Sequence, residues 1–254
     1  MLWPHRALVK NRVFSVERVA RTTSTQDVVR RAARAGAPDG FCCLAGEQTA
    51  GRGRQGRRWQ APPGSSMLAS VLVRLTAGAA PGVPFAAGLA MVDALASLCP
   101  GVDARLKWPN DVLAGGRKLA GLLAEVEPAS GEPDELAVAV GAGLNLRVDH
   151  FPPGVDAVSL HRLTNNVPDA DTLLDAWLPA LDGRLIQLES EGLPGVLLDW
   201  KTRAAGLGRP VRAQAGSGVV EGIAADIADD GALLIVTGEA TIRLLAGDVH
   251  LLDP

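Results

Sequence analysis

The feature that most constrains this 254-residue chain is a change of pattern near residues 206–209. Beyond that point glycine and aspartate recur at short intervals, as at Asp229-Asp230-Gly231. Four short β patterns follow there, at residues 210–214, 218–227, 232–237 and 241–245. A stretch so short and so rich in turns predicts a small β-barrel rather than further strands of a large sheet. We therefore predict two domains, residues 1–206 and residues 207–254.

Strand and helix patterns alternate through the first predicted domain. Strands are predicted at residues 13–19, 41–45, 67–75, 102–107, 119–126 and 136–141. Helices are predicted at residues 25–35 and 84–98 and along the apolar stripe of Leu174, Leu178, Leu181, Leu185 and Leu188, and residues 199–205 resemble the tail of a further helix. Ser24 and Asp27 have the spacing of a capping box, and Gly36 ends that first helix. Pro179 predicts a kink or a break in the leucine stripe.

Composition excludes several classes of protein. Hydrophobic residues make up 47% of the chain, enough for a substantial core, and no long uncharged apolar run predicts a membrane-spanning helix. The net charge of −3 gives no reason to expect a nucleic-acid partner. The first ten residues lack the apolar region of a secretory signal. Three cysteines, Cys42, Cys43 and Cys99, without metal-ligand spacing favour a reducing cytoplasm.

The strongest local signal is Gly-Arg-Gly-Arg-Gln-Gly-Arg-Arg-Trp at residues 51–59, called the 51–59 segment below. Its glycines let backbone N–H groups converge on one point, and its arginines can fork onto phosphate or carboxylate oxygens. We expect this segment to be mobile when empty and to close over an anionic ligand, with Trp59 holding its far end. Composition alone also fits an exposed turn or an RNA-contacting patch, and for an isolated run that interpretation is the stronger one.

A second signal is Lys107-Trp108-Pro109-Asn110-Asp111, followed by Lys118 and Gly121. A turn around Pro109 and Gly115-Gly116 would separate two strands and turn polar side chains toward a cleft. Asp111 could hold Mg²⁺ or a ligand amine, and Lys118 could set its ammonium beside an anion. Gly121 would let a ligand approach the strand backbone. Ordinary turn chemistry and a solvated strand end are the plainer interpretations.

Two weaker signals accompany these. Residues 22–26, Thr-Thr-Ser-Thr-Gln, offer hydroxyls and backbone donors at a helix N-terminus, which suit a small polar head group. Helix capping by Ser24 is the simpler account of them. Residues 141–145, Gly-Ala-Gly-Leu-Asn, end a strand, and a tight turn that needs glycine is their simpler account.

Together and in this order, these four segments resemble the biotin–protein ligase family, over nearly the whole chain. The resemblance implies an α+β fold, with a mixed β-sheet catalytic domain backed by helices and then a small SH3-like β-barrel. It implies a ligase that forms biotinyl-5′-AMP from biotin and ATP with Mg²⁺. The biotin would then pass to a lysine of a biotin carboxyl carrier protein domain. No metal site of the protein's own is assigned, a homodimer is common in such a family, and an N-terminal helix-turn-helix is not expected.

Residue roles follow from the resemblance, motif by motif. It implies biotin binding by Ser24, Thr25, Gln26, Gln48, Gly51, Arg52, Gly53, Lys118 and Gly121. It implies nucleotide binding by Arg54, Arg57, Trp59, Asn110, Asp111 and Asn145. Catalysis would fall to Lys118, Arg54 and Asp111. Gln26 stands where the family usually has asparagine, and Gln55 stands where some members have a basic residue.

The implied chemistry needs no general base in its first half, because the biotin carboxylate is already ionised at neutral pH. Which group assists deprotonation of the acceptor lysine stays open between Asp111 and Lys118. A lipoate–protein ligase is the nearest alternative, and the intact 51–59 segment with residues 107–111 favours biotin. A non-enzymatic RNA-binding module is the alternative of another class, and the acidic sequence pI of about 5.8 argues against it.

Overall fold

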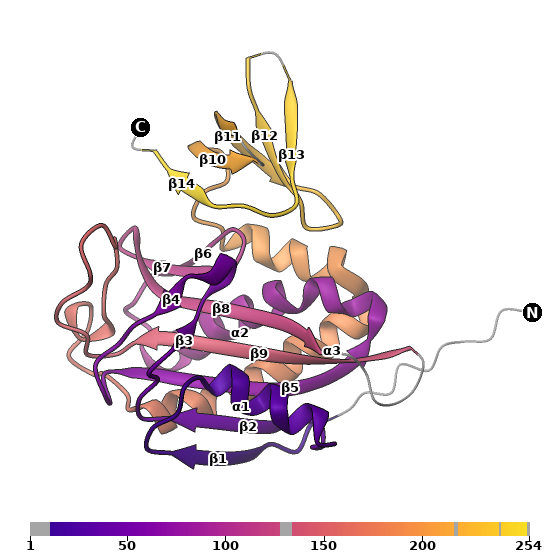
Figure 1. Ribbon diagram of the computed structural model, residues 1–254. Coiled ribbons are helices and arrows are strands. Elements are labelled where there is room, and N and C mark those ends of the chain that lie inside the picture. The colour runs from indigo at the N-terminus through magenta and orange to yellow at the C-terminus, as the bar shows by residue number, and fades with distance from the viewer. Residues whose placement is uncertain (1–10, 128–133, 216–217, 239, 253–254) are drawn as a thin grey trace, which may run out of the picture.

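The computed structural model describes residues 11–127, 134–215, 218–238 and 240–252. A seven-stranded sheet forms its centre (Figure 1). In spatial order the strands are β1 (Ser15–Val19), β2 (Phe41–Ala45), β5 (Ser66–Thr76), β9 (Glu135–Asn145), β8 (Arg117–Glu127), β7 (Asp111–Ala114) and β6 (Ala104–Lys107). β1 and β2 are parallel, and every other neighbouring pair is antiparallel. The sheet is therefore mixed, as predicted.

Helices cover both faces of this sheet (Figure 1). They are α1 (Thr25–Arg34) on one face, with α2 (Val83–Leu98) and α3 (Ala170–Thr202) on the other. Strand β9 shows why the faces differ, because a strand turns successive side chains to opposite sides. Val138 and Val140 join the main core with α2 and α3, whereas the small Ala137 and Ala139 lie under α1 beside Val29. The two faces of β9 therefore belong to two separate hydrophobic clusters.

Helix α2 lies inside the protein. By length and composition the stretch Ala77–Leu98, which includes the 3₁₀ turn η2 (Ala77–Gly82), could cross a membrane, yet 72% of its most apolar part is buried by other residues. Phe85, Leu89 and Leu95 are among its core side chains. The cysteines of β2 are fully buried core residues too, and this desolvation raises the pKa of Cys42 to about 12 and of Cys43 to about 11.

A second sheet of five antiparallel strands lies at the C-terminal end (Figure 1). In spatial order they are β13 (Thr241–Leu244), β12 (Leu233–Val236), β11 (Gly218–Ile227), β10 (Pro210–Ala215) and β14 (Val249–Leu251). Four of them match the predicted patterns, and β14 was not predicted. Trp108 Nε1 donates to Gly231 O at 3.0 Å, which joins this sheet to the loop before β7. The arrangement agrees with the expected small SH3-like barrel.

The capping box predicted at the start of α1 is wrong. Ser24 is the N-cap residue by its backbone angles, but its side chain makes no capping hydrogen bond. Asp27 instead accepts a hydrogen bond from Arg52. Gly36, with φ of +84°, follows the end of the helix as predicted.

Three further expectations are corrected. Backbone angles stay helical through Pro179, and the break in α3 falls at Gly192, where φ is +71°. Residues 141–145 are not a tight turn, because β9 continues to Asn145. The turn expected after Pro109 contains strand β7, which begins at Asp111.

Candidate active site

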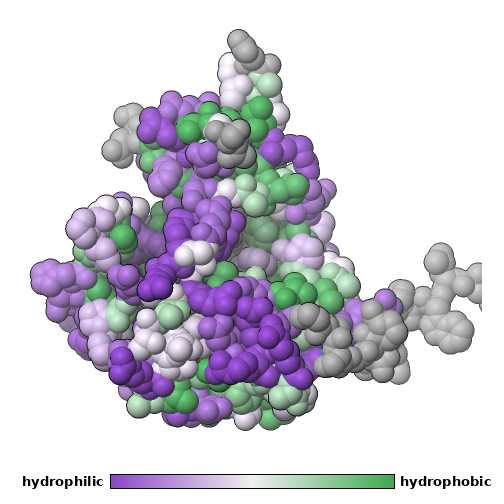
Figure 2. All heavy atoms as spheres, in the orientation of Figure 1, coloured by the Kyte–Doolittle hydropathy of each residue, from purple (hydrophilic) through white to green (hydrophobic). Residues whose placement is uncertain are grey.

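The 51–59 segment is a hairpin and not an irregular loop. Strands β3 (Gly51–Arg52) and β4 (Arg58–Trp59) pair on either side of the 3₁₀ turn η1 (Arg54–Gly56). Gly53 N donates to Arg57 O at 2.8 Å and closes the turn. The hairpin crosses over β8, and hydrophilic side chains gather on this side of the molecule (Figures 1 and 2).

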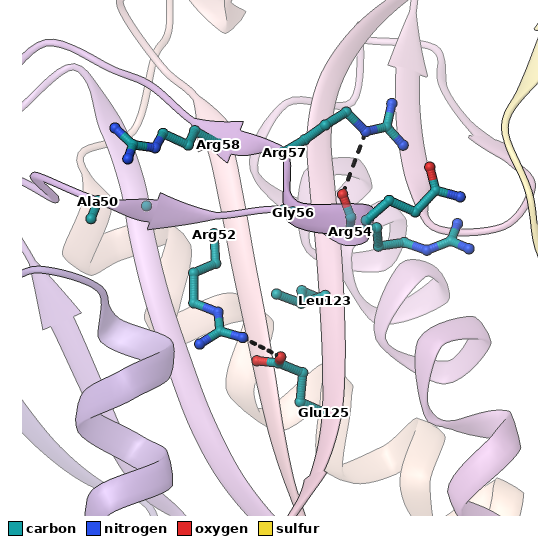
Figure 3. A pocket seen from close by; sticks show the side chains of 11 residues that line it. Ala50, Arg52, Arg54, Gly56, Arg57, Arg58, Leu123 and Glu125 are labelled. Carbon is teal, nitrogen blue, oxygen red and sulfur yellow. Dashed lines mark hydrogen bonds and ion pairs between the residues drawn. The ribbon is translucent and has the colours of Figure 1, made fainter.

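A cavity of about 490 Å³ lies along this hairpin. Its walls are the hairpin itself with Leu123 and Glu125 of β8, as Figure 3 shows. Leu123 and Glu125 alternate with the core-facing Leu122, so they share the α1 face of the sheet. The guanidinium groups of the hairpin and a carboxylate of the sheet therefore face the same space.

Trp59 pins one end of the hairpin, as the sequence predicted. A Cβ atom on Gly143 would lie 2.6 Å from the Trp59 ring, and one on Gly121 would lie 3.1 Å from it. Lys118 Nζ stands 5.8 Å from the ring centroid, in cation–π range. Gly121 and Gly143 are thus required for close approach of the indole to the sheet, not for unusual backbone angles.

A charged cluster lies around Asp111. Lys118 Nζ is 2.5 Å from Asp111 Oδ1, and Lys107 Nζ is 3.8 Å from Asp111 Oδ2. Arg54 Nη1 donates to Asn110 Oδ1 at 3.1 Å, which links the hairpin to the same turn. Burial lowers the pKa of Lys107, and desolvation likewise lowers that of Arg54. Three cations around one carboxylate leave net positive charge, which suits an anionic ligand.

A neutral polar cluster lies at the N-terminus of α1. Gln48 Oε1 accepts from Thr25 N at 2.7 Å, and Thr25 Oγ1 is 2.8 Å from Ser70 Oγ. Ser70 donates to Gln26 Oε1 at 3.0 Å, and Gln26 Nε2 donates to Ala139 O at 2.9 Å. Ser24 Oγ is buried without a hydrogen-bond partner among the described residues. A buried hydroxyl in that state can bind a ligand's polar atom.

The remaining predicted site residues are spread around these clusters. Arg52 reaches Asp27 and Glu125, and Arg57 pairs with Asp248 in the loop before β14. Asn145 is buried at the end of β9 and donates to Val158 O at 3.3 Å. Lys118 lies against Trp59 and is not among the residues that line the cavity. The structure thus brings Lys118, Asp111 and Arg54 together and leaves Lys118 beside the cavity.

Sequence reasoning missed several residues of this region. They are Asp27, Ser70, Lys107, Leu123, Glu125 and Asp248. Lys107 stood inside a quoted motif, so its charge was the available signal. Asp248 meets Arg57 across 191 residues of chain, and no local pattern marks such a contact.

Comparison with known proteins first defines the class. The model of the biotin/lipoate A/B protein ligase family matches residues 18–145, and the model of the biotin protein ligase C-terminal domain matches residues 206–252. The chain therefore belongs to the biotin/lipoate A/B protein ligase family.

Individual relatives are more specific. The biotin–[acetyl-CoA-carboxylase] ligase of Mycobacterium tuberculosis is 40% identical over 91% of this chain and 86% of its own length. The Paracoccus denitrificans protein of the same name is 38% identical over 85% of this chain and 92% of its own length. Among solved structures, biotin protein ligase from Aquifex aeolicus in complex with biotin and ATP has a TM-score of 0.78 at 26% identity. That match covers 94% of this chain and 99% of the other. All three are biotin ligases by name.

Proposed function

We propose that this chain is an ATP-dependent ligase that forms biotinyl-5′-AMP and transfers biotin to a lysine of a carrier protein. The acceptor is a biotin carboxyl carrier protein or the carrier domain of a biotin-dependent carboxylase. One observation carries the proposal for the site. The 51–59 segment, through Trp59 and Arg54, contacts both Lys118 and Asn110 of the turn that holds Asp111.

In the first half-reaction a biotin carboxylate oxygen attacks the α-phosphorus of ATP. The bond from that phosphorus to the bridging oxygen breaks, and pyrophosphate leaves with the electron pair. Lys118 and Arg54 stabilise the negative charge that builds on the phosphoryl oxygens. Arg57, Trp59, Asn110, Asp111 and Asn145 complete the nucleotide side. Asp111 keeps Lys118 oriented through their 2.5 Å ion pair.

Biotin lies in this proposal between the neutral polar cluster and the hairpin. Ser24, Thr25 and Gln48 meet its polar head group, and Gly51 and Gly53 allow the hairpin backbone to approach it. Gly121, which the resemblance also assigns to biotin binding, lies under the indole of Trp59 and acts by seating that ring. Gln26, which is 2% exposed, already bonds Ala139 and Ser70. It therefore supports the head-group site by packing beneath it.

Mg²⁺ enters with ATP as part of the substrate. The described residues hold no group of three or more His, Cys, Asp or Glu side chains suited to a metal ion. Bound to the triphosphate, Mg²⁺ neutralises charge on the leaving pyrophosphate. Asp111 is the carboxylate of the cluster that could contact it.

In the second half-reaction the acceptor lysine, as the neutral amine, attacks the acyl carbon of biotinyl-AMP. A C–N bond forms, the C–O bond to AMP breaks, and AMP leaves. The amine must lose a proton, and Asp111 is the group we assign to receive it. It lies 2.5 Å from Lys118 Nζ and 3.8 Å from Lys107 Nζ, in the cluster that the hairpin reaches through Arg54.

The decisive test incubates the full chain with biotin, ATP, Mg²⁺ and a purified carrier domain. Mass spectrometry is expected to find one biotinyl group on the carrier lysine. A parallel incubation with lipoate tests the alternative that the family model includes. Transfer of lipoate without transfer of biotin contradicts the proposal, as does pyrophosphate exchange that depends on neither acid.

Three broader proposals accompany this one. The chain divides into a ligase domain, residues 1–206, and a C-terminal barrel, residues 207–254, and the match of the C-terminal family model to residues 206–252 supports this division. The protein acts in the cytoplasm without a nucleic-acid or membrane partner. A homodimer stays a prediction, which sedimentation velocity with and without biotin and ATP would test.

A further inference from the structure

Arg52 ties the hairpin to two different elements. Its Nη1 donates to Asp27 Oδ1 at 2.8 Å, and its Nη2 donates to Glu125 Oε1 at 2.6 Å. Asp27 lies in the first turn of α1, and Glu125 lies on β8. Figure 3 shows Arg52 directed from the hairpin toward Glu125, whereas Arg54 and Arg57 lie at the other end. Arg52 is thus placed to act separately from those two arginines.

Glu125 is itself held by a second set of charges. Arg30 Nη1 lies 3.7 Å from Glu125 Oε1, and the same guanidinium donates to Glu127. Glu127 is only 1% exposed and also accepts from Arg34 at 2.8 Å. The buried Glu127 carboxylate holds Arg30 in place, because moving Arg30 away would leave a buried charge without one of its partners. Arg30 in turn lies beside Glu125, the residue that Arg52 binds. Arg52 therefore binds to an anchor that belongs to the packed α1 face.

The position of these ion pairs relates them to the cavity. Arg52 and Glu125 both line it. Arg54, which also lines it, contacts Asn110 at the opposite end of the hairpin. The Arg52 pairs are partly open to solvent, with 37% of the Arg52 side chain and 24% of the Glu125 side chain exposed. Pairs of this kind can break and re-form without unfolding the chain.

We propose that Asp27 and Glu125 are positioning residues that latch Arg52 and thereby hold the 51–59 segment closed over the acyl-adenylate. The inference rests on the proposed function, since a mixed anhydride survives only where water is excluded. Neither carboxylate needs to touch the reacting atoms. The latch controls how long biotinyl-AMP stays bound rather than the transition state for its formation.

The test compares dissociation of biotinyl-AMP from the full chain with its rate of formation. E125Q and D27N keep the shape of each side chain and remove its charge. Each is expected to raise the ratio of the release rate to the single-turnover adenylation rate about fivefold, the range of an exposed ion pair. Without carrier, both variants should therefore release more biotinyl-AMP into solution. Added salt should speed release from the unmodified chain more than from the variants.

Further variants separate a latch from a general structural role. R52Q and the double variant R52Q/E125Q should release biotinyl-AMP at the same rate, because R52Q already breaks the pairs to Asp27 and Glu125 and the second change removes no further contact with residue 52. R52K, which keeps the charge but not the two-pronged geometry, should fall between R52Q and the unmodified chain. R18Q is the matched control, since it breaks the exposed Arg18–Asp171 pair far from the hairpin.

Release ratios of E125Q and D27N equal to that of the unmodified chain would overturn the latch, whatever their melting temperatures. Additive effects of R52Q and E125Q would overturn it as well. If the unmodified chain fails to bind biotinyl-AMP at all, the proposed function fails instead, so the two failures are distinguishable.

Discussion

The two ends of the candidate site use opposite chemistry. At the N-terminus of α1, neutral groups such as Thr25, Gln26 and Ser70 are buried and bonded to one another. Around β7 and β8, Lys118 and Asp111 carry full charges and remain partly exposed. Directed hydrogen bonds between neutral groups discriminate shape, whereas charges stabilise a phosphoryl group whatever acid it activates. In the proposed site, recognition of the acid and activation of its carboxylate are therefore physically separate, and each can be disturbed alone.

The largest expected effect comes from removing the ammonium at the charged end. Lys118→Ala is expected to lower the adenylation rate by about two to three powers of ten, because one transition-state contact of this kind is worth roughly 3–4 kcal/mol. Biotin-dependent ATP–pyrophosphate exchange measures it. The affinity for biotin's head group should change much less. A near-normal exchange rate would show that the charged end does not act as described.

The next largest effect is expected from a side chain that fills the space over Gly143, where the Trp59 indole packs. Gly143→Val places atoms where the indole now lies, since even a Cβ would be 2.6 Å from the ring. Overpacking of about 1–3 kcal/mol then works against closure and weakens ligand binding roughly 5- to 150-fold. Isothermal titration with biotin and ATP measures this loss. Gly101→Val is the control for a general effect of replacing glycine, because Gly101 is exposed and a Cβ there would meet nothing within 4 Å.

A change in the neutral polar cluster should lower both the stability of the fold and the affinity for biotin. Ser70→Ala removes the hydroxyl between Thr25 and Gln26. The buried Gln26 Oε1 then loses its donor, whereas Thr25 Oγ1 keeps its hydrogen bond to Gln48. We expect a loss of about 1–3 kcal/mol in the free energy of unfolding and weaker biotin binding. Urea denaturation and titration with biotin measure the two. Unchanged stability would contradict the hydrogen-bond network at this end.

Ser24 separates ligand binding from helix capping. Because its hydroxyl makes no capping bond, Ser24→Ala should change stability by less than the roughly 1 kcal/mol of a lost cap. Biotin affinity should fall about 3- to 10-fold, the value of one neutral hydrogen bond. A destabilised protein with normal biotin affinity would favour the capping role. Thermal melts with and without biotin distinguish these results.

The smallest expected effect concerns pH. Burial lowers the pKa of Lys107 below the ordinary lysine value of 10.5, so the folded chain loses this proton before the unfolded chain does. The stability cost of the buried ammonium is present below the folded pKa and disappears as pH rises through it. The difference in free energy of unfolding between the unmodified chain and Lys107→Met should therefore become smaller as pH rises. The affinity for nucleotide should fall over the same pH range, because the ammonium charge is lost. Unfolding and nucleotide titrations from pH 7 to 10 measure both, and a difference that grows would contradict the assignment.

Periodicity and turn residues were enough to predict most elements of the fold. The six strands predicted in the first domain, the helices over α1 and α2 and four of the five C-terminal strands all appear, because alternation and helical stripes are local properties. Strands β3, β4, β7 and β14 were not predicted. β7 lies between the turn residues Pro109 and Gly115-Gly116, and the other three have only two or three residues, too few to show alternation. Pro179 suggested a break that the helix accommodates, whereas Gly192 breaks it in a left-handed conformation.

The inventory of chemical groups and their order along the chain were readable from residue types alone, and they led to the family. Strand register and packing in the folded protein determined which of these side chains contact one another. Gly143 is small because Trp59 lies on it, Glu125 meets Arg52 across the sheet face, and Asp248 reaches Arg57 from the C-terminal sheet. The physical reason is that a polar partner is chosen by distance and burial in the folded state. Neither quantity is encoded in the residues adjacent to either partner.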